Sequence, residues 1–304
     1  MKGTGTHAAS RCVAVIPARD AAVTLGRTLE SLRVGDDGFV QRILVVTSRD
    51  DASATAAERH REFDPRIEVI RASSPLSAGA ARNLGRTATN AALLLFVDAD
   101  CWLESGGARA LHRELESRSL DAVSACVRRD GGGAVARVRH ALEFKEAEGR
   151  RAAPAHWLPP STTMLCRASA FDAAGGFPDM FPGEDLVLSH RLRTLGHHVE
   201  RSDGVSTWHQ HPPGLVTMLR HQYRLGSTAA AARATSSMHG SLFVRFPLLA
   251  PLLLPARLMR VVRWYAAHDP AWVIAALPLL AVGLGAWTAG FARAAWGMRR
   301  GRAA

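Results

Sequence analysis

The sequence has few cysteines, with four in 304 residues. Cys12, Cys101, Cys126 and Cys166 are far apart, and none has a cysteine or histidine partner at the spacing of zinc ligands. This pattern speaks against a zinc-binding domain and against a small secreted domain held together by disulfides. We expect four reduced cysteines inside the protein core.

A secretory signal is also lacking. Residues 1–11 are small and polar, and the first apolar run, Val13 to Ile16, is too short for the core of a signal peptide. We therefore expect residues 1–11 to form a disordered N-terminus and the main domain to stay in the cytoplasm.

Acidic residues are nearly absent from the last third of the chain. From Pro212 onward there are eleven arginines and one acid, Asp269, whereas the first 211 residues carry 27 basic and 26 acidic residues. A basic segment that is also rich in Leu, Ala, Trp and Pro favours contact with anionic lipid. The net charge of +11 therefore does not predict a nucleic-acid partner.

The first half of the chain alternates apolar runs of strand length with helical patterns. Strands are expected at 12–16, 42–46, 67–70 and 92–97, and helices at 25–32, 52–61 and 78–89. Continuous apolar strands between helices predict an α/β fold whose parallel sheet is covered on both faces. Ligands of such sheets bind at the carboxyl ends of the strands, so the site is expected to follow Ile16, Val46 and Val97.

A second series of elements is expected to extend this sheet. Strands are predicted at 121–127 and 161–166, with helices around 138–149 and 186–195. These elements are expected to build the side of the site that receives the second substrate.

The end of the chain differs in kind. Residues 246–256 are apolar but contain three prolines, so they cannot form one regular spanning helix. The spacing of Arg257, Arg260 and Arg263, with apolar residues between them, is typical of a helix at a lipid interface.

The last apolar run, 271–292, carries no charged residue over 22 positions and is long enough to cross a membrane, although Pro278 and three glycines weaken it. A buried helix pair in a soluble protein is the alternative; membrane embedding is favoured.

The strongest local signal is a buried strand that ends in Asp98-Ala99-Asp100. In an extended chain, residues two apart point the same way. Two carboxylates at the end of a parallel strand suit a hard divalent cation that also binds diphosphate oxygens. Taken alone, the pair is better explained as a helix cap or a turn.

Two other segments carry suitable chemistry. The small residues around Gly79 let the backbone approach a ligand, and Arg82, beside Asn83, suits a phosphate or a base edge. Glu184 and Asp185 begin a predicted helix, whose dipole keeps a carboxylate ionised and suits a general base for a hydroxyl. Ordinary stabilisation of the helix is the alternative for these two acids.

Taken in order along residues 12 to 210, five motifs make the chain resemble the family 2 glycosyltransferases. They are Pro17-Ala18-Arg19-Asp20, Gly79-x-x-Arg82-Asn83, Asp98-x-Asp100, Gly175-Gly176-Phe177 and Gly183-Glu184-Asp185.

The resemblance implies a Rossmann-like fold of the glycosyltransferase A type, with a mainly parallel mixed sheet. It implies Mg²⁺ or Mn²⁺ held by Asp98 and Asp100, and inversion at the anomeric carbon. Asp185 would deprotonate the acceptor hydroxyl, which displaces the nucleoside diphosphate in one step; Glu184 is the weaker candidate for this base.

Two turns depart from the family pattern. Arg19, Asp20 and Ala21 stand where the family commonly has Tyr-Asn-Glu, and Thr47 to Asp51 replaces an Asp-Asp-Gly-Ser turn that faces the nucleobase. The base contact is open between Asp50, Asp51 and Ser48. The predicted nucleotide-sugar residues are Pro17, Ala18, Arg19, Asp20, Ser48, Asp50, Gly79, Arg82, Asn83, Asp98, Ala99 and Asp100.

His209 and His211 form the last polar cluster before the basic tail. Two residues apart, they would share one side of a strand, and one of them would complete the metal shell, as a late histidine does in resembling enzymes. We favour His211. The alternative is that each is a solvated or core histidine.

Rival classes lack their signatures. A dinucleotide-dependent dehydrogenase needs Gly-x-Gly where this chain has Pro17-Ala-Arg-Asp20, and a nucleotidyltransferase needs a glycine-rich basic loop at the same turn. A membrane-bound scaffold with an inactive transferase-like domain is the alternative from another class, because two nucleotide motifs are altered.

We therefore expect an inverting, metal-dependent hexosyltransferase that acts on a lipid or lipid-linked glycan at the cytoplasmic face of the inner membrane. The predicted catalytic domain covers 12–211, with a nucleotide-sugar half at 12–104 and an acceptor half at 105–211. A basic helical linker at 212–241 and a membrane-associated helical tail at 242–304 follow.

Overall fold

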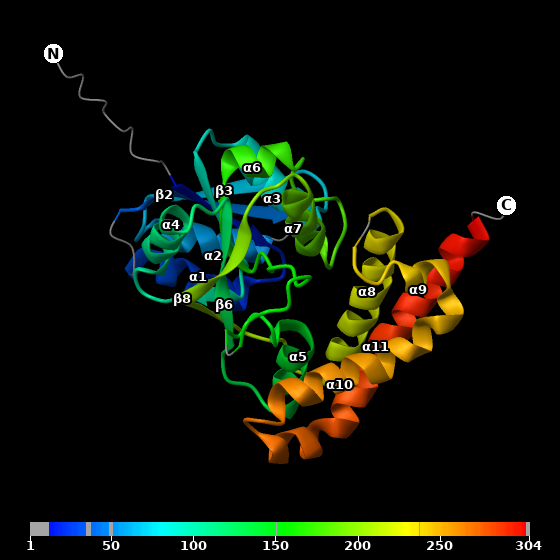
Figure 1. Ribbon diagram of the computed structural model, residues 1–304. Coiled ribbons are helices and arrows are strands. Elements are labelled where there is room, and N and C mark those ends of the chain that lie inside the picture. Colours follow the sequence, from blue (N-terminus) through cyan, green and yellow to red (C-terminus); the bar gives the residue numbers. More distant parts are fainter. Residues whose placement is uncertain (1–11, 35–37, 49–50, 150, 237, 302–304) are drawn as a thin grey trace. The chain divides into compact units, whose positions relative to one another are not determined.

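The computed structural model describes residues 12–34, 38–48, 51–149, 151–236 and 238–301 (Figure 1). The chain divides into two compact units, each assembled from separate stretches of sequence. The sheet unit contains Met1–Cys126, Pro159–Asp179 and Arg191–Trp208, and the helical unit contains Val127–Leu158, Met180–His190 and His209–Ala304. The predicted disorder of residues 1–11 lies outside the described residues.

Eight strands form one sheet in the order β3-β2-β1-β4-β7-β6-β8-β5. They are β1 (Cys12–Ala18), β2 (Val40–Ser48), β3 (Ile67–Ala72), β4 (Leu93–Val97), β5 (Cys101–Leu103), β6 (Ala122–Arg129), β7 (Thr163–Arg167) and β8 (Val199–His209). Strands β1 to β4 pair in parallel, whereas β7 runs antiparallel to both β4 and β6. The predicted mixed sheet is confirmed, with its parallel part in the first half of the chain.

Helices cover both faces of this sheet, as the sequence predicts. In the sheet unit they are α1 (Ala22–Val34), α2 (Asp51–Arg61), α3 (Ala78–Thr87), α4 (Gly107–Ser117) and α6 (Ala168–Ala173). Helix α5 (Ala134–Phe144) belongs to the helical unit, and α7 (Glu184–Thr194) begins in the helical unit and ends in the sheet unit. Leucines of α1 and α4 share a core with Ala14 and Ile16 of β1, while Gly85 of α3 lies against Val15, which points to the other face. All four cysteines are buried and none forms a disulfide, as expected.

The strand register brings three carboxyl ends together. Ala18, the last residue of β1, pairs with Thr47 of β2, and Val15 pairs with Phe96 of β4. The residues that follow β1, β2 and β4 therefore lie side by side at one edge of the sheet, where ligands of parallel sheets bind. The strand ends that the sequence predicts to carry the site therefore lie together, while the site itself stays a prediction.

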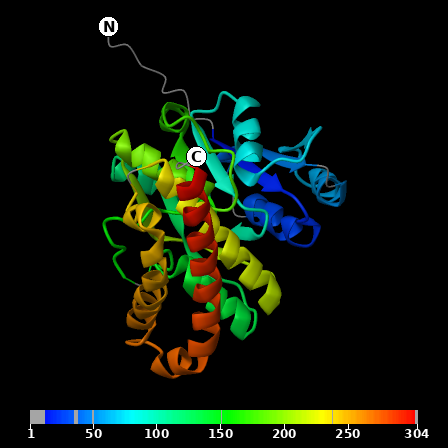
Figure 2. The same cartoon turned by 90° about the vertical axis from the view of Figure 1, so that its right-hand side faces the viewer.

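Most of the helical unit lies after residue 209. Its elements there are α8 (Leu215–Ala234), α9 (Leu242–Arg245), the 3₁₀ helix η1 (Pro247–Leu252), α10 (Leu253–Tyr265) and α11 (Pro270–Gly301). Figure 2 shows α11 running along α8, with α10 beside it. The expected break at residues 246–256 is confirmed, because Pro247 and Pro251 lie in the 3₁₀ helix.

The helices α8 and α11 approach each other at glycines. A Cβ atom on Gly226 would lie 1.9 Å from the carbonyl oxygen of Trp287, and one on Gly290 would lie 2.0 Å from that of Tyr223. The hydroxyl of Ser227 donates to the carbonyl of Gly290 at 3.2 Å. From the sequence, Gly290 is expected to weaken the predicted membrane helix. In the structure, it lets α8 and α11 pack closely.

Helix α11 has one buried and one exposed face. Leu280, Leu284 and Phe291 are buried against the other helices of the unit, whereas Ile274 is 71% exposed. Length and composition would allow Pro270–Arg299 to cross a membrane, but 44% of its most apolar window is buried. This is weak support for the predicted membrane segment.

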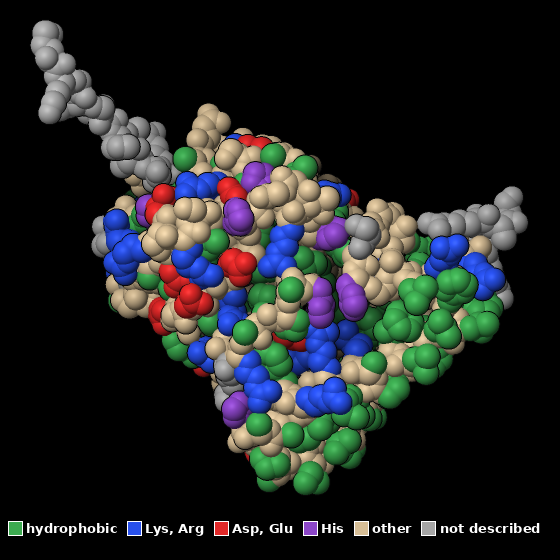
Figure 3. Space-filling model, viewed as in Figure 1, with side chains coloured by type: hydrophobic (Ala, Val, Ile, Leu, Met, Phe, Trp, Pro, Cys, Tyr) green, Lys and Arg blue, Asp and Glu red, His purple; other side chains and the backbone are tan. Residues whose placement is uncertain are grey.

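Further apolar side chains of the helical unit are exposed near α11. Leu248 and Leu252 of η1 are 72% and 58% exposed, and Met259 of α10 is 50% exposed. Figure 3 shows hydrophobic side chains gathered along α9, α10 and α11. We call the exposed apolar residues of η1, α10 and α11 the apolar face.

Candidate active site

The two carboxylates of Asp98 and Asp100 lie in a tight turn after β4. The amide of Asp98 donates to the carbonyl of Thr162 at 2.8 Å, and its carbonyl accepts from the amide of Cys101 at 3.0 Å. Ala99 is buried, while both acids are half-buried. The turn thus packs its alanine inward and leaves two carboxylates within reach of solvent.

Arg82 of α3 is the ionic partner of Asp98. Its guanidinium is only 3% exposed and forms an ion pair with Oδ1 of Asp98. The guanidinium carbon also lies 4.9 Å from the centre of the Phe177 ring. The pair holds the carboxylate of Asp98 in place and balances the charge of Arg82, because an unpaired buried guanidinium would be costly.

Asn83 ties α3 to the Gly175-Gly176-Phe177 motif. Its side-chain amide donates to the carbonyl of Phe177 at 2.8 Å, and its Oδ1 accepts from the amide of Phe177 at 3.0 Å. Gly176 has φ +67°, and a Cβ there would lie 2.7 Å from Asn83 Oδ1. Asn83 and Phe177 are 94 residues apart in the sequence, yet their two motifs are in direct contact in the structure.

The loop before α3 is fixed from both sides. Ser77 caps the helix by accepting from the amide of Ala80 at 3.1 Å, and its hydroxyl donates to Asp179 at 2.7 Å. Arg19, exposed after β1, donates to the carbonyl of Leu76 at 3.3 Å. These contacts join the turn after β1 to the small residues around Gly79.

The other predicted donor residues lie at the same edge. Pro17 and Ala18 end β1, and Asp20 follows in the left-handed region with φ 56°. The backbone of Ser48 ends β2 opposite Ala72. Asp50 lies outside the described residues. The nucleobase contact that the sequence left open therefore stays a prediction.

The electrostatic field at the turn is negative. Cys101 is fully buried, and burial together with the charges of Asp100 and Asp98 raises the pKa of its thiol well above the usual range. A set of carboxylate oxygens in a negative field suits a hard divalent cation better than a soft one. The donor chemistry of this turn therefore fits Mg²⁺ or Mn²⁺.

Glu184 and Asp185 form the first turn of α7, as predicted. Gly183 precedes them with φ +100°, and Oδ1 of Asp185 accepts from the amide of Leu186 at 2.8 Å. Glu184 is buried, whereas Asp185 is half-buried. Of the two acids, Asp185 is the more accessible to a substrate hydroxyl.

His209 and His211 lie close together, but not on one strand as predicted, because β8 ends at His209. Their ring centres are 4.4 Å apart. Nε2 of His211 is 3.1 Å from Nδ1 of His140, whose Nε2 is 3.3 Å from Glu148. Burial and the neighbouring histidines hold the pKa of His211 far below its usual range, so its ring is neutral.

The two ring nitrogens of His211 differ in their surroundings. Nε2 is in contact with His140, which lies beside Glu148. Nδ1 is buried and has no hydrogen-bond partner among the described residues. Such an atom, held by a carboxylate–histidine pair, is suited to ligate a metal.

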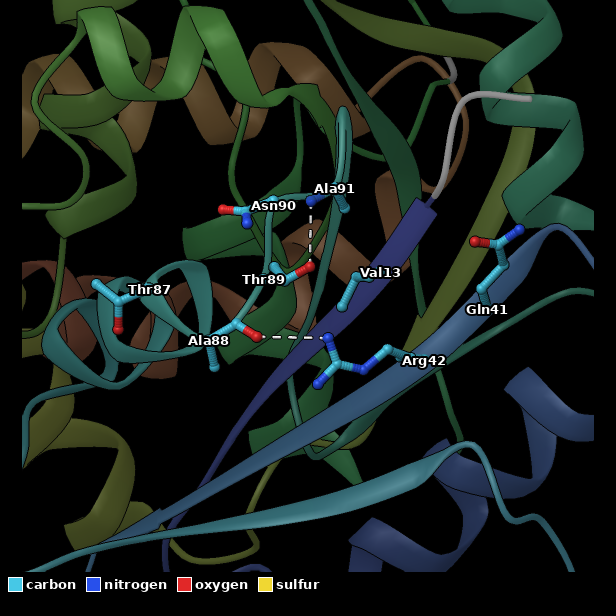
Figure 4. A pocket seen from close by; sticks show the side chains of 8 residues that line it. All are labelled: Val13, Gln41, Arg42, Thr87, Ala88, Thr89, Asn90 and Ala91. Carbon is cyan, nitrogen blue, oxygen red and sulfur yellow. Dashed lines mark hydrogen bonds between the residues drawn. The ribbon is translucent and has the colours of Figure 1, made fainter. Parts of the chain in front are cut away.

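A pocket of about 440 Å³ lies at the opposite edge of the sheet unit (Figure 4). It is lined by the first residues of β1 and β2 and by the turn before β4: Val13, Gln41, Arg42, Thr87, Ala88, Thr89, Asn90 and Ala91. Arg42 is already held there by Glu68, at 2.6 Å, and by the carbonyl of Ala88. Because it lies at the amino ends of the strands, this pocket is not the candidate active site.

Several contacts of the site have no signal in the sequence alone. The pairing of Arg82 with Asp98, the anchoring of Asp98 by Thr162 and the contact of His140 with His211 join residues that are distant along the chain. The Gly-Gly-Phe motif and Asn83 were both recognisable in the sequence, but their contact with each other was not.

The family is shown by comparison with known sequences. The sequence profile described as glycosyltransferase like family 2 matches residues 10–227. The chain therefore belongs to this family. Two curated relatives, both the pre-mycofactocin glycosyltransferase of Mycobacterium tuberculosis (strains CDC 1551 / Oshkosh and H37Rv), are each 31% identical to it over 231 residues. That match covers 71% of this chain and 46% of each relative, so the chain spans about half the length of these relatives.

Solved structures share the fold. The mannosyltransferase PcManGT from Pyrobaculum calidifontis, in complex with GDP-Man and Mn²⁺, superposes with a TM-score of 0.69 at 17% identity, over 94% of this chain and 87% of that one. Residues 1–349 of S. aureus TarS, in complex with UDP-GlcNAc, give 0.56 at 12% identity, over 96% and 92%. Together they establish a glycosyltransferase A-type fold for this chain.

Proposed function

We propose that this protein is an inverting, metal-dependent hexosyltransferase that uses a nucleotide-diphosphate sugar. The observation that carries the proposal is the pair of carboxylates, Asp98 and Asp100, after β4, with Arg82 paired to the first. The neighbours solved with GDP-Man and Mn²⁺ and with UDP-GlcNAc support a donor of this class.

The donor side of the reaction uses the carboxyl edge of the sheet. Asp98 and Asp100 would hold the divalent cation, with His211 as a further ligand; when bound, the cation neutralises the charge of the departing diphosphate. Arg82 holds the carboxylate of Asp98 in position. The ends of β1 and β2, with Arg19, Asp20 and Ser48, would face the nucleotide.

The acceptor side uses the first turn of α7. Asp185 would take the proton from the acceptor hydroxyl, whose oxygen then bonds to the anomeric carbon as the bond from that carbon to the diphosphate oxygen breaks. The helix dipole and the amide of Leu186 favour the ionised carboxylate. A single displacement inverts the configuration at the anomeric carbon.

The acceptor is proposed to be a lipid or a lipid-linked glycan at the cytoplasmic face of the inner membrane. The apolar face, with Leu248 at 72% and Ile274 at 71% exposure, and the eleven arginines after Pro212 support contact with an anionic bilayer. Because α11 forms a core with α8, removing residues 242–304 would strip that core. Exchange of exposed residues is the cleaner test.

Two experiments test this function. The full chain with Mn²⁺ is screened by thermal shift against UDP, GDP, TDP and CDP sugars, and the donor that stabilises it is then supplied with lipid acceptors. We expect a product of inverted anomeric configuration by NMR, lost with EDTA and with Asp185→Asn. A retained configuration, or turnover unchanged by EDTA, contradicts the mechanism.

Membrane contact is tested by flotation with vesicles of phosphatidylglycerol and phosphatidylcholine. Leu248→Ser with Ile274→Ser is expected to weaken binding, whereas Val23→Ser, at a site 92% exposed in the sheet unit, is the matched control. Equal binding by all three proteins contradicts the use of the apolar face.

A further inference from the structure

Four basic side chains of the helical unit form one group of charges with Glu146. Lys145, just after α5, and Arg260 of α10 pair with Glu146 at 3.0 and 2.8 Å. Arg257, one turn before Arg260, and Arg233, near the end of α8, act electrostatically on the same group of charges. Figure 3 shows Lys and Arg side chains gathered over α5, α8 and α10.

The positive charges of these side chains lie close together although they repel one another. Burial lowers the pKa of Lys145 to about 8, and the charges of Arg257 and Arg260 act in the same direction. The pKa of Arg257 is lowered to about 10 by burial and by Arg233 and Arg260. The single negative charge of Glu146 offsets only part of the positive charge of the group. Cations held together at such a cost are typical of a binding site for an anion.

The side chains are also oriented for binding. The guanidinium of Arg257 lies over the ring of Trp287, with 4.0 Å from its carbon to the ring centre, and its Nε is buried without a hydrogen-bond partner among the described residues. Arg233 is held by the carbonyls of His239 and Ala229 at 2.8 and 2.9 Å. A stacked, anchored guanidinium keeps its edge available for two phosphate oxygens.

We propose that Lys145, Arg233, Arg257 and Arg260 form a binding site for a phosphate-bearing group. The phosphate belongs either to a lipid head group or to a soluble phosphorylated compound. Helix α10, which carries Arg257 and Arg260, also carries the exposed Met259 of the apolar face, so a lipid phosphate would reach the site from the membrane surface. The site lies wholly in the helical unit and does not depend on the proposed sugar transfer.

The first test uses inorganic phosphate on the full chain, with chloride at equal ionic strength as reference. We expect phosphate to raise the melting temperature of the wild type by about 2 °C or more. Arg257→Met is expected to lose at least half of this gain. Because the variant removes one of several crowded like charges, it should melt at an equal or higher temperature than the wild type in chloride, which a merely structural arginine would not do.

Arg263→Met is the matched control, because Arg263 lies exposed on the same helix and its loss removes the same charge. It should keep the full gain from phosphate. An equal gain in the wild type and in Arg257→Met, or no gain in the wild type, overturns the site.

The second test separates the two sources of phosphate. Binding of the full chain to phosphatidylcholine vesicles with and without phosphatidic acid is measured for the wild type, Arg257→Met and Arg263→Met. If the arginines act only through general attraction to the anionic vesicle surface, either variant should bind the vesicles about fivefold more weakly than the wild type. A loss for Arg257→Met at least three times that for Arg263→Met supports a lipid head group. If both variants lose vesicle binding equally, while phosphate still raises the melting temperature only of proteins that keep Arg257, the ligand of the site is a soluble phosphate compound.

Discussion

Arg82 and Asp98 form a buried ion pair between α3 and the turn after β4, so the first carboxylate of the candidate metal site is held by a charge from a neighbouring helix. Arg82 is 3% exposed and Asp98 is 24% exposed. The pair therefore links the stability of the sheet unit to the geometry of its site.

Loss of the arginine is expected to destabilise the protein. Arg82→Met leaves Asp98 without its cation and should lower the free energy of unfolding by about 1–3 kcal/mol, because Asp98 is partly solvated. Arg86→Met, on the same helix, breaks the more exposed pair with Asp172 and should cost less than about 1 kcal/mol. Urea unfolding measures both; equal costs contradict a special role for Arg82.

The contact of Gly176 with Asn83 predicts a position that accepts no side chain. Gly176→Ala should cost more than about 2 kcal/mol, because it adds a Cβ 2.7 Å from Asn83 Oδ1 to an unfavourable φ of +67°. Gly175→Ala has a similar φ, +74°, but open space, so it measures the backbone strain alone. If the two variants unfold at the same urea concentration, the Asn83 contact does not restrict this position.

The close approach of α8 and α11 gives a second pair of glycines to compare. Gly226→Ala places a Cβ 1.9 Å from the carbonyl of Trp287 and should lower the unfolding free energy by more than about 2 kcal/mol. Gly297→Ala, on α11 with nothing within 4 Å, should be neutral or stabilising by about 0.5–1 kcal/mol. Calorimetry measures the unfolding free energy of both variants. If Gly226→Ala is as stable as the wild type, the close approach of α8 and α11 is contradicted.

Burial of Lys145 predicts a pH dependence. Its folded pKa of about 8 lies below the unfolded value of about 10.4, so between these values the unfolded chain binds more protons and the contribution of Lys145 to stability rises with pH. Comparison with Lys145→Met cancels the titration of other groups. The stability of the wild type relative to the variant should rise by on the order of 2 kcal/mol from pH 7.5 to pH 10. A constant difference across this range contradicts the lowered pKa.

The parallel half of the fold was predictable because its strands are continuous apolar runs. The predicted 12–16 and 92–97 correspond to β1 and β4, each within two residues of the observed ends. Apart from its end at His209, strand β8 (Val199–His209) was not predicted, because Glu200, Arg201 and Asp203 interrupt its apolar pattern. Its burial depends on neighbours that only the folded sheet supplies.

The candidate site was predictable as a set of motifs but not as a set of contacts. Local spacing identified Asp98, Asp100 and Asp185, since each stands at the end of a recognisable strand or the start of a helix. The arginines of α10 show the limit of such patterns. Their spacing predicts a lipid-facing stripe, whereas Arg257 and Arg260 are half-buried beside Glu146. Which face a helix buries depends on the elements that pack against it.

The most direct test of the central claim is calorimetric binding of the donor identified by the thermal-shift screen, with and without Mn²⁺, to the wild type and to Asp100→Asn. Asp203→Asn, at a side chain 78% exposed in the sheet unit, is the control. We predict Mn²⁺-dependent binding by the wild type and the control. For Asp100→Asn we predict a loss of about tenfold or more in affinity with an unchanged melting temperature. Mn²⁺-dependent binding by Asp100→Asn at the affinity of the wild type would contradict the assignment of the metal and diphosphate site to Asp98 and Asp100.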